Sequence, residues 1–243
     1  MFTYPTTFYQ TVSGGASNGL LNNLVAAYEM NSDATDETWT YDATATNITW
    51  DTTNKKIGTA SGSYNGTSSI IEVPDLNLDA WDFTLCSWFR IPTDDNLRHQ
   101  IFAIHSTGSF ANKIEVYIGN NSESDTIRCV MRDWAAGGTT FGGSTNYKTG
   151  DWFQTIVTRT ASTWFVEVFI NGVSVASQTD ATENKATLWP EYDIGAFKVW
   201  ATLYNEFIGN IDQTLYYNAV LDSTRIAALY NSWDWLAYAD FTV

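Results

Sequence analysis

Carboxylate and histidine side chains are the first candidates for chemistry, and their spacing does not form a catalytic set. A retaining glycosidase needs two carboxyl groups about 5–5.5 Å apart, but Glu115 and Glu167 each stand alone in a strand-like run. His99 and His105 are the only histidines in the sequence, and they are six residues apart. One Gly-x-Ser-x-Gly pattern occurs, at residues 15–19, but it lies in a Ser- and Gly-rich stretch and not between a strand and a helix, as a hydrolase nucleophile requires. No zinc-type cysteine pair occurs. The sequence therefore predicts a protein that is not an enzyme.

Aromatic side chains in loops point to binding instead. Trp134, Trp189 and Trp200 fall in or near polar and glycine-rich stretches, and Tyr192 follows in the stretch Leu-Trp-Pro-Glu-Tyr. An exposed indole offers a flat apolar face to the C–H side of a sugar ring and an N–H to its hydroxyl groups. We predict that these four residues bind carbohydrate. The alternative is that each ring packs beneath its own loop, as large aromatic residues commonly do.

Short strand-like runs must position these residues. Runs rich in apolar, β-branched and aromatic residues recur about every 8–15 residues, with turn residues between them, which is typical of a β-sandwich. The expected strands cover residues 69–73, 83–91, 100–105, 113–119, 126–132, 152–158, 164–170, 173–177 and 206–217. Asn171-Gly172 lies between two of these runs and predicts a type I′ hairpin turn. One helix is expected over 222–230, with Asp222 as its N-cap.

Composition and charge exclude several classes of protein. The chain has 243 residues, of which 44% are hydrophobic and 15% aromatic, so it is long enough and apolar enough to fold. A formal net charge of −15 makes nucleic acid and anionic membranes poor partners.

No stretch approaches the roughly 18 apolar residues of a membrane span, and no secretory signal is visible. We expect a location on a virion surface or outside the cell, reached by another route. Cys86 and Cys129 each lie in a strand-like run, and the sequence leaves their pairing open.

The two ends of the chain differ from its middle. Residues 1–19 end in a Ser- and Gly-rich joint, and we expect an arm that docks onto another subunit or an extra edge strand. Residues 20–243 form the predicted sandwich domain. Its aromatic tail, 231–243, either packs back on the sandwich or contacts another subunit, because a free tail this apolar would aggregate.

A series of short motifs follows one order along nearly the whole chain. They are Leu24–Asn31, Trp50, Lys56–Ala60, Tyr64–Gly66, Ile70–Val73, Phe83–Arg90, Gly150–Trp152, Phe169–Val173, Asp193–Gly195, Phe207–Asp212 and Leu221–Tyr230. Each motif is weak alone, but in this order they resemble the laminin-G-like branch of the concanavalin A-like lectin/glucanase superfamily. The resemblance implies an all-β fold, a two-sheet antiparallel β-sandwich of the jelly-roll type, with one short helix near the C-terminus.

The resemblance also implies a structural calcium ion. Proteins with this fold often hold Ca²⁺ between the opening strand and the late Gly-x-Ile-Asp strand. Asn31 and Asp212 occupy the matching positions, with backbone carbonyl groups near Gly66 as further ligands. Carboxylate, amide and carbonyl oxygens all suit calcium. Asn31 departs from the aspartate that is usual in the family, which removes one negative charge from the site.

Function follows from the fold only as an expectation, because one fold hosts many functions. The closely spaced Glu-x-Asp-x-x-Glu of the family's glucanases is absent from this sequence. We therefore predict lectin-like carbohydrate recognition, as part of a larger surface assembly, with a glycan and other structural subunits as partners. The alternative is a purely structural virion component, such as a bacteriophage decoration, fibre or tail protein, without glycan binding. A glycoside hydrolase is the least favoured of the three.

Overall fold

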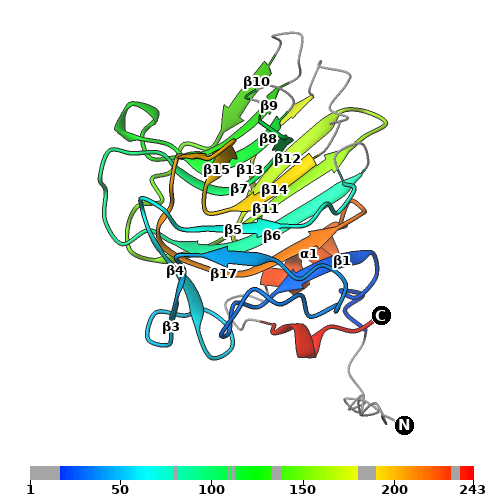
Figure 1. The fold of residues 1–243 in the computed structure, drawn as a ribbon. Helices are drawn as coiled ribbons and strands as arrows, with labels where there is room; N and C mark the ends of the chain where they lie inside the picture. Colours follow the sequence, from blue (N-terminus) through cyan, green and yellow to red (C-terminus); the bar gives the residue numbers. More distant parts are fainter. Residues whose placement is uncertain are drawn as a thin grey trace.

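Two antiparallel sheets form a sandwich in the computed structural model (Figure 1). The structure describes residues 17–78, 82–108, 110, 113–132, 138–179, 190–230 and 236–243. The eight-stranded sheet follows the order β13-β12-β11-β6-β17-β4-β3, and β1 also pairs with β17. The seven-stranded sheet follows the order β10-β9-β8-β7-β14-β5-β2. The predicted all-β jelly-roll sandwich is confirmed.

The strands and helices have the following bounds. The eight-stranded sheet contains β1 Leu24–Tyr28, β3 Thr49–Asp51, β4 Ser61–Asn65, β6 Phe83–Arg90, β11 Trp152–Thr160, β12 Phe165–Ile170, β13 Val173–Thr179 and β17 Ile208–Tyr217. The seven-stranded sheet contains β2 Thr44–Thr46, β5 Ile70–Val73, β7 His99–Ser106, β8 Lys113–Ile118, β9 Ile127–Arg132, β10 Gly138–Gly142 and β14 Pro190–Ile194. The other elements are the hairpin β15 Phe197–Val199 and β16 Thr202–Tyr204, the helix α1 Ser223–Tyr230, and the 3₁₀ turns η1 Asn121–Glu123 and η3 Tyr238–Asp240.

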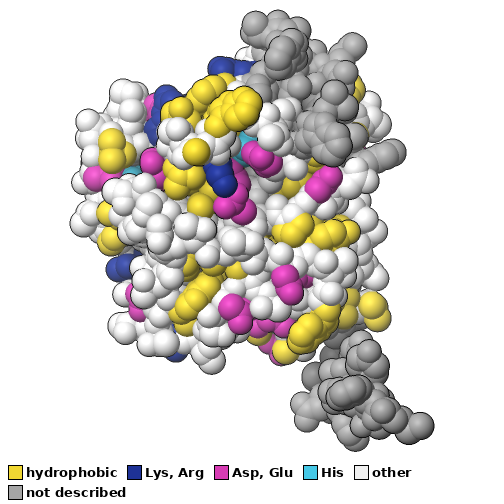
Figure 2. All heavy atoms as spheres, viewed as in Figure 1, with side chains coloured by type: hydrophobic (Ala, Val, Ile, Leu, Met, Phe, Trp, Pro, Cys, Tyr) yellow, Lys and Arg dark blue, Asp and Glu magenta, His cyan; other side chains and the backbone are white. Residues whose placement is uncertain are grey.

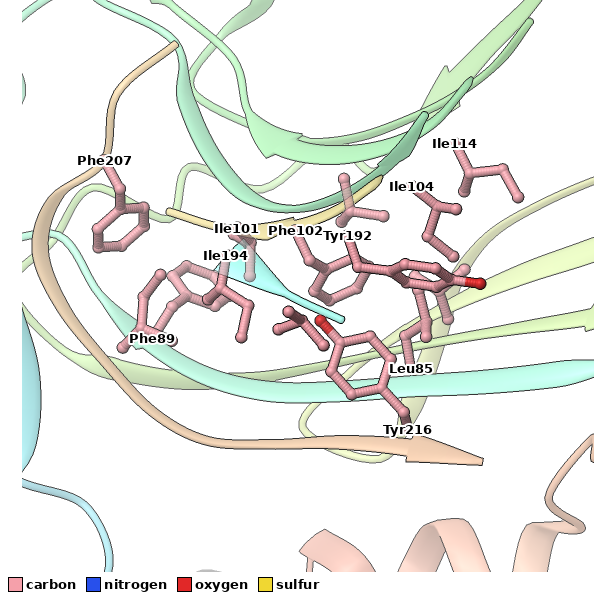
Figure 3. Packing of buried hydrophobic residues seen from close by; sticks show 14 of the residues in the cluster. Leu85, Phe89, Ile101, Phe102, Ile104, Ile114, Tyr192, Ile194, Phe207 and Tyr216 are labelled. Carbon is pink, nitrogen blue, oxygen red and sulfur yellow. The ribbon is translucent and has the colours of Figure 1, made fainter. Parts of the chain in front are cut away.

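The main core lies between the two sheets. Leu85, Phe89 and Tyr216 project from the eight-stranded sheet, and residues such as Phe102 and Ile194 meet them from the seven-stranded sheet (Figure 3). Successive strand residues point to opposite faces, so this layer takes every second residue of most strands. Burying so many apolar side chains is the dominant stabilising term of the fold.

A second apolar cluster lies on the outer face of the eight-stranded sheet. Ile226 and Leu229 of α1, together with Phe241 near the C-terminus, pack there on side chains that include Cys86. Asp222 caps the helix as predicted, because its Oδ1 accepts a hydrogen bond from the Arg225 backbone N–H at 2.9 Å. The described part of the aromatic tail, residues 236–243, therefore packs back on the sandwich.

Most of the predicted elements are present. The nine expected strands and the helix all appear, with ends that shift by up to two residues. Asn171 and Gly172 both have positive φ, of 52° and 75°, as a type I′ turn requires. Strand β1 was expected only from the family resemblance. Strands β2, β3, β4, β10, β14, β15 and β16 were not predicted, because most of them are short and contain Gly, Pro or polar residues. The two cysteines do not form a disulfide with each other: Cys86 lies in the outer cluster, and Cys129 lies in the other sheet facing the main core.

The N-terminal arm was predicted to cover residues 1–19, and residues 1–16 lie outside the described part of the chain. The residues that follow run beside the C-terminus. The Asn18 backbone N–H donates to Thr242 Oγ1 at 2.8 Å, and Leu21 donates to the Thr242 carbonyl at 3.1 Å. The beginning and the end of the described chain therefore lie side by side.

Candidate functional site

The outer face of the seven-stranded sheet presents polar side chains at its centre. In β8 the intervening isoleucine and valine residues enter the main core, so Lys113, Glu115 and Tyr117 point away from it. The strand register places Arg132 of β9 opposite Lys113, and Ala103 of β7 opposite Glu115. Charged and aromatic groups of β8 and β9 thus share one surface with Ala103 of β7.

The β15–β16 hairpin covers part of this surface. Phe197 and Val199 pack on Ala103 in a small apolar cluster of their own. The Phe197 ring lies edge-on to Phe110, with 5.6 Å between the centroids, and Phe110 lies 5.0 Å from the ring of Tyr204. Phe110 and Tyr204 remain 47% and 37% exposed. The hairpin therefore builds an aromatic wall beside the polar face of β8.

A groove of about 440 Å³ lies between this wall and strands β8–β10. In the upper part of Figure 2, hydrophobic side chains lie next to Lys and Arg side chains on the same face. The groove is lined by Arg98, Phe110, Lys113, Glu115, Tyr117, Glu123, Val130, Arg132, Thr140, Phe197, Tyr204 and Asn205. Two larger and more open hollows, of about 650 and 690 Å³, also lie among the described residues. The first is lined by no aromatic side chain, and the second has Tyr41 as its one aromatic lining residue. The mix of rings and charged groups makes the groove the candidate binding site.

Most charged groups in the groove are held by partners. Arg98 donates through Nε and Nη2 to the two carboxylate oxygens of Glu123, each at 2.8 Å. Lys113 Nζ lies 2.8 Å from Glu115 Oε2. Burial, followed by the charge of Glu123, raises the pKa of Tyr117 to about 12. The tyrosine hydroxyl therefore stays protonated and donates to Glu123 Oε1 at 3.2 Å.

A buried polar pair supports the hairpin from below. His105 Nε2 lies 2.8 Å from Asp193 Oδ2, and both side chains are buried. The same carboxylate oxygen accepts a hydrogen bond from the backbone N–H of Lys198, in β15, at 2.9 Å. The Phe197 ring lies edge-on to the His105 ring, with 4.6 Å between the centroids. Asp193 is therefore engaged in holding the hairpin on the sheet.

The carboxylates of this face do not form an open pair. Glu115 and Asp193 lie in one row across the sheet, on either side of Ala103. Their backbones are two strand spacings apart, or about 9.6 Å, and Phe197 packs on the alanine between them. A glycosidase needs two accessible carboxyl groups that flank the scissile bond. Glu115 and Asp193 do not form such a pair, because Phe197 packs on the residue between them.

One of the predicted carbohydrate-binding residues lies beside the aromatic wall. Trp200 is at the tip of the β15–β16 hairpin and is 78% exposed. Its indole packs on Gly108, where an added Cβ would come within 2.8 Å of the ring. Phe110 follows Gly108 by two residues, so the tryptophan extends the wall. Trp134 and Trp189 lie outside the described residues.

The prediction for Tyr192 needs correction. Tyr192 is 1% exposed and lies in the main core, so it has no surface to offer a sugar. Its hydroxyl oxygen accepts a hydrogen bond from the backbone N–H of Leu78 at 2.8 Å. The physical reason is that residues 190–194 form β14, in which Tyr192 and Ile194 face the core while Glu191 and Asp193 alternate with them.

The residues predicted to bind calcium are only partly brought together. Asp212 Oδ2 accepts hydrogen bonds from the backbone N–H groups of residues 56 and 57, at 2.7 and 2.9 Å. Asn31 Oδ1 accepts one from the backbone N–H of Thr59, at 2.5 Å. Both side chains therefore anchor segment 56–59. Gly66 is not close to them. It lies beside Ile208, and Ile208 is about 13 Å from Asp212 along β17.

One feature of Asp212 still suits a cation. Its Oδ1 is buried and has no hydrogen-bond partner, and carboxylate oxygen is a preferred calcium ligand. Among the residues that the structure describes, no cluster of three or more His, Cys, Asp or Glu side chains could hold a metal. Calcium binding therefore stays a prediction, in which Asp212 would need backbone and amide oxygens as its companions.

Asp212 is expected to make the protein less stable as the pH rises from 5 to 8 in the presence of EDTA. Burial raises the pKa of its carboxyl from 3.8 to about 7, although backbone hydrogen bonds oppose this. The folded state thus keeps a proton that the unfolded state has released, and this stabilisation disappears as the pH passes the folded-state pKa. Tm should fall by at least about 5 °C. Asp212→Asn should abolish the part of the Tm decrease that Asp212 causes. If the Tm of this variant fell with pH as steeply as that of the unchanged protein, the result would contradict the raised pKa of Asp212.

The groove itself was not predicted from the sequence. A local signal exists in β8, where Lys113, Glu115 and Tyr117 alternate with apolar residues, as they would on a strand with one polar face. Phe110 and Tyr204 carry no such signal. They belong to separate segments that only the tertiary structure brings together.

Comparisons with known proteins place the fold. Residues 65–227 match a family model described as "Concanavalin A-like lectin/glucanases superfamily". No curated protein sequence matches the chain. Domain 4 of AbnA, a GH43 extracellular arabinanase from Geobacillus stearothermophilus solved with arabinotriose, superposes with a TM-score of 0.64 and 20% identity. That alignment covers 86% of this chain and 98% of the arabinanase domain.

Binding domains of two toxins superpose on this chain with TM-scores close to that of the arabinanase domain. The binding domain of botulinum neurotoxin serotype D has a TM-score of 0.65 and 16% identity, over 86% of this chain and 52% of the toxin domain. The binding domain of Paraclostridial Mosquitocidal Protein 1 has a TM-score of 0.65 and 16% identity, over 87% of this chain and 52% of that domain. The chain therefore spans about half the length of these toxin domains, and the likeness concerns the fold.

The family assignment rests on the match to the family model, and the architecture agrees with it. Among the described residues, no helix is long and apolar enough to cross a membrane. The matched segment, 65–227, covers more than half of the chain and includes most strands of both sheets and the residues that line the groove. The chain belongs to the concanavalin A-like lectin/glucanase superfamily.

Proposed function

We propose that this chain is a non-catalytic carbohydrate-binding module that holds a saccharide in the groove beside the β15–β16 hairpin. The observation that carries the proposal is one groove in which the exposed rings of Phe110 and Tyr204 face charged groups of β8 and β9. Sugar rings stack their C–H faces on aromatic rings, and their hydroxyl groups need hydrogen-bond partners. The groove presents both kinds of contact.

The structural neighbours support a binding role. The arabinanase domain was solved with arabinotriose, and the serotype C/D neurotoxin domain is a receptor-binding domain. The proposed module is non-catalytic because the carboxylates of the groove face are engaged: Glu115 with Lys113, and Asp193 with His105. Turnover of any polysaccharide in an activity screen would overturn that part of the proposal.

Tyr204→Ala is expected to weaken saccharide binding by roughly tenfold, the effect of losing one stacking ring. The ligand would be selected on a glycan array with the full chain, and its affinity measured by isothermal titration calorimetry. Trp39→Ala is the matched control, because Trp39 is 83% exposed but does not line the groove. Equal affinities of the Tyr204 and Trp39 variants would place the ligand elsewhere and overturn the groove as the site.

The alternative function is that of a purely structural virion component. Light scattering and saccharide binding, measured on the same protein, distinguish the two functions. Gln213 Nε2 donates to the carbonyl of Leu236 at 2.7 Å, and Phe241 is buried, so tail residues 236–243 are engaged within the chain. A subunit contact would have to use other surfaces. A large assembly of fixed copy number in light scattering, without saccharide binding, would favour the structural role. A chain that binds a saccharide in the groove would favour the proposed module.

A further inference from the structure

The groove carries a positive charge that no described residue neutralises. Its lining holds three cations and two carboxylates. The Arg98–Glu123 and Lys113–Glu115 ion pairs account for four of these groups, which leaves Arg132 without an ion pair among the described residues. The chain as a whole has a formal net charge of −15. A surplus cation in the groove of so acidic a protein marks the place where an anionic group would be favoured.

Arg132 is placed to reach into the groove. It is the last residue of β9, it is exposed, and the register sets it between Lys113 of β8 and Gly138 of β10. A Cβ added to Gly138 would come 3.3 Å from Arg132 Nε. The arginine side chain therefore lies against the glycine, in space that a larger residue would fill. A guanidinium group recognises a carboxylate through two parallel hydrogen bonds.

The Glu115 carboxylate, which also lines the groove, has one oxygen atom without a hydrogen-bond partner. The Glu115 side chain is more than nine-tenths buried, and its Oε2 is paired with Lys113. Its Oε1 has no hydrogen-bond partner. Lys113 is further engaged by the Phe197 ring, whose centre lies 4.5 Å from Nζ. A buried carboxylate oxygen without a donor is costly. Because Glu115 lines the groove, a small turn of its carboxylate would bring Oε1 to a ligand hydroxyl group that supplies the donor.

We propose that the saccharide held in the groove is acidic, with its carboxylate on Arg132, a hydroxyl group on Glu115 Oε1 and a ring face on Tyr204. This inference rests on the proposed function and names the class of ligand. The three contacts need a sugar that combines a negative charge, hydroxyl donors and an apolar face, as uronic and sialic acids do. Neutral sugars would leave Arg132 without a partner.

The test compares matched acidic and neutral saccharides on the full chain. Trigalacturonic acid and its methyl ester form one pair, and sialyllactose and lactose form the other. Calorimetry should show that at least one acid binds ten times or more tighter than its neutral partner, with an affinity that falls as salt rises from 50 to 500 mM. Arg132→Gln should reduce the acid to the affinity of the neutral form. Lys55→Gln is the control, because it removes the same charge from an exposed position outside the groove.

The outcomes separate this inference from the proposed function. Equal binding of acid and neutral forms, lost in Tyr204→Ala, would overturn the acidic ligand while the carbohydrate-binding groove stands. A preference for acids that survives Arg132→Gln would overturn the role of Arg132. Failure of all four saccharides, when neutral glycans of the array bind, would also overturn the acidic class. Failure of every glycan would overturn the proposed function with it.

Discussion

Replacing Lys148 with methionine is expected to lower the free energy of unfolding by about 3–5 kcal/mol. The lysine side chain is fully buried, and its Nζ lies 3.0 Å from Asp125 and donates to the carbonyl of Leu97 at 2.7 Å. The carboxylates of Asp94 and Asp95 each lie 3.6 Å from the same nitrogen. Without the cation, the buried carboxylate of Asp125 would lose its ion-pair partner, and the three carboxylates would repel one another. Urea unfolding followed by tryptophan fluorescence would measure the loss.

The effect is large because Lys148 joins three loops at one end of the sandwich. It belongs to the segment between β10 and β11 and binds the β6–β7 loop and the β8–β9 turn. The last two segments also contribute Arg98 and Glu123 to the groove. Lys148 therefore positions one end of the candidate site, and we expect its replacement to weaken saccharide binding as well.

Lys198→Met is the matched control for this prediction. Lys198 pairs with Glu72 on the surface, where both side chains are partly exposed, and such pairs contribute less than about 1 kcal/mol. Adding Asp125→Asn to Lys148→Met should recover part of the lost stability, because the two residues interact directly. A loss below 1 kcal/mol for Lys148→Met would show that water solvates the cluster.

Asp36→Ala is expected to cost roughly 4 kcal/mol, because it would leave four backbone donors, one buried and three partly buried, without their acceptor. Asp36 Oδ1 accepts hydrogen bonds from the backbone N–H groups of Ala27 and Thr38, at 2.8 and 3.0 Å. Asp36 Oδ2 accepts them from Thr40 and Tyr41, at 3.2 and 3.0 Å. One buried carboxylate therefore folds the loop between β1 and β2 and ties it to β1. Thermal unfolding would measure the loss.

Two further variants make this prediction specific. Asp33→Ala changes an exposed carboxylate in the same loop that accepts a single backbone hydrogen bond, from the Thr35 N–H, and a long one of 3.5 Å from the Ser32 hydroxyl. Its cost should stay within about 0.5 kcal/mol, as for most surface substitutions. Asp36→Asn keeps one acceptor oxygen and should fall between the two. A similar cost for Asp33→Ala and Asp36→Ala would contradict the role of the buried carboxylate.

The sequence by itself determined the fold class and most of the strands. Alternation of apolar and polar residues is a local property, and it predicted β8, β9 and β12 closely. Asn171-Gly172 predicted its turn because the backbone there requires positive φ. Asp222 predicted the start of α1 because a side-chain oxygen caps the first backbone donors. These signals need no knowledge of which strands pair.

Only the tertiary structure decided which side of each strand meets the core and which residues meet across the sheet. Tyr192 illustrates the first point, since the preceding Pro190 and a tryptophan made its short strand resemble a binding loop, while pairing with β5 and β7 turned the ring inward. The groove illustrates the second, because Phe110, Tyr204 and Arg132 come from three separate segments. Strand order and side-chain packing depend on contacts between distant residues, and a single sequence carries no local signal for them.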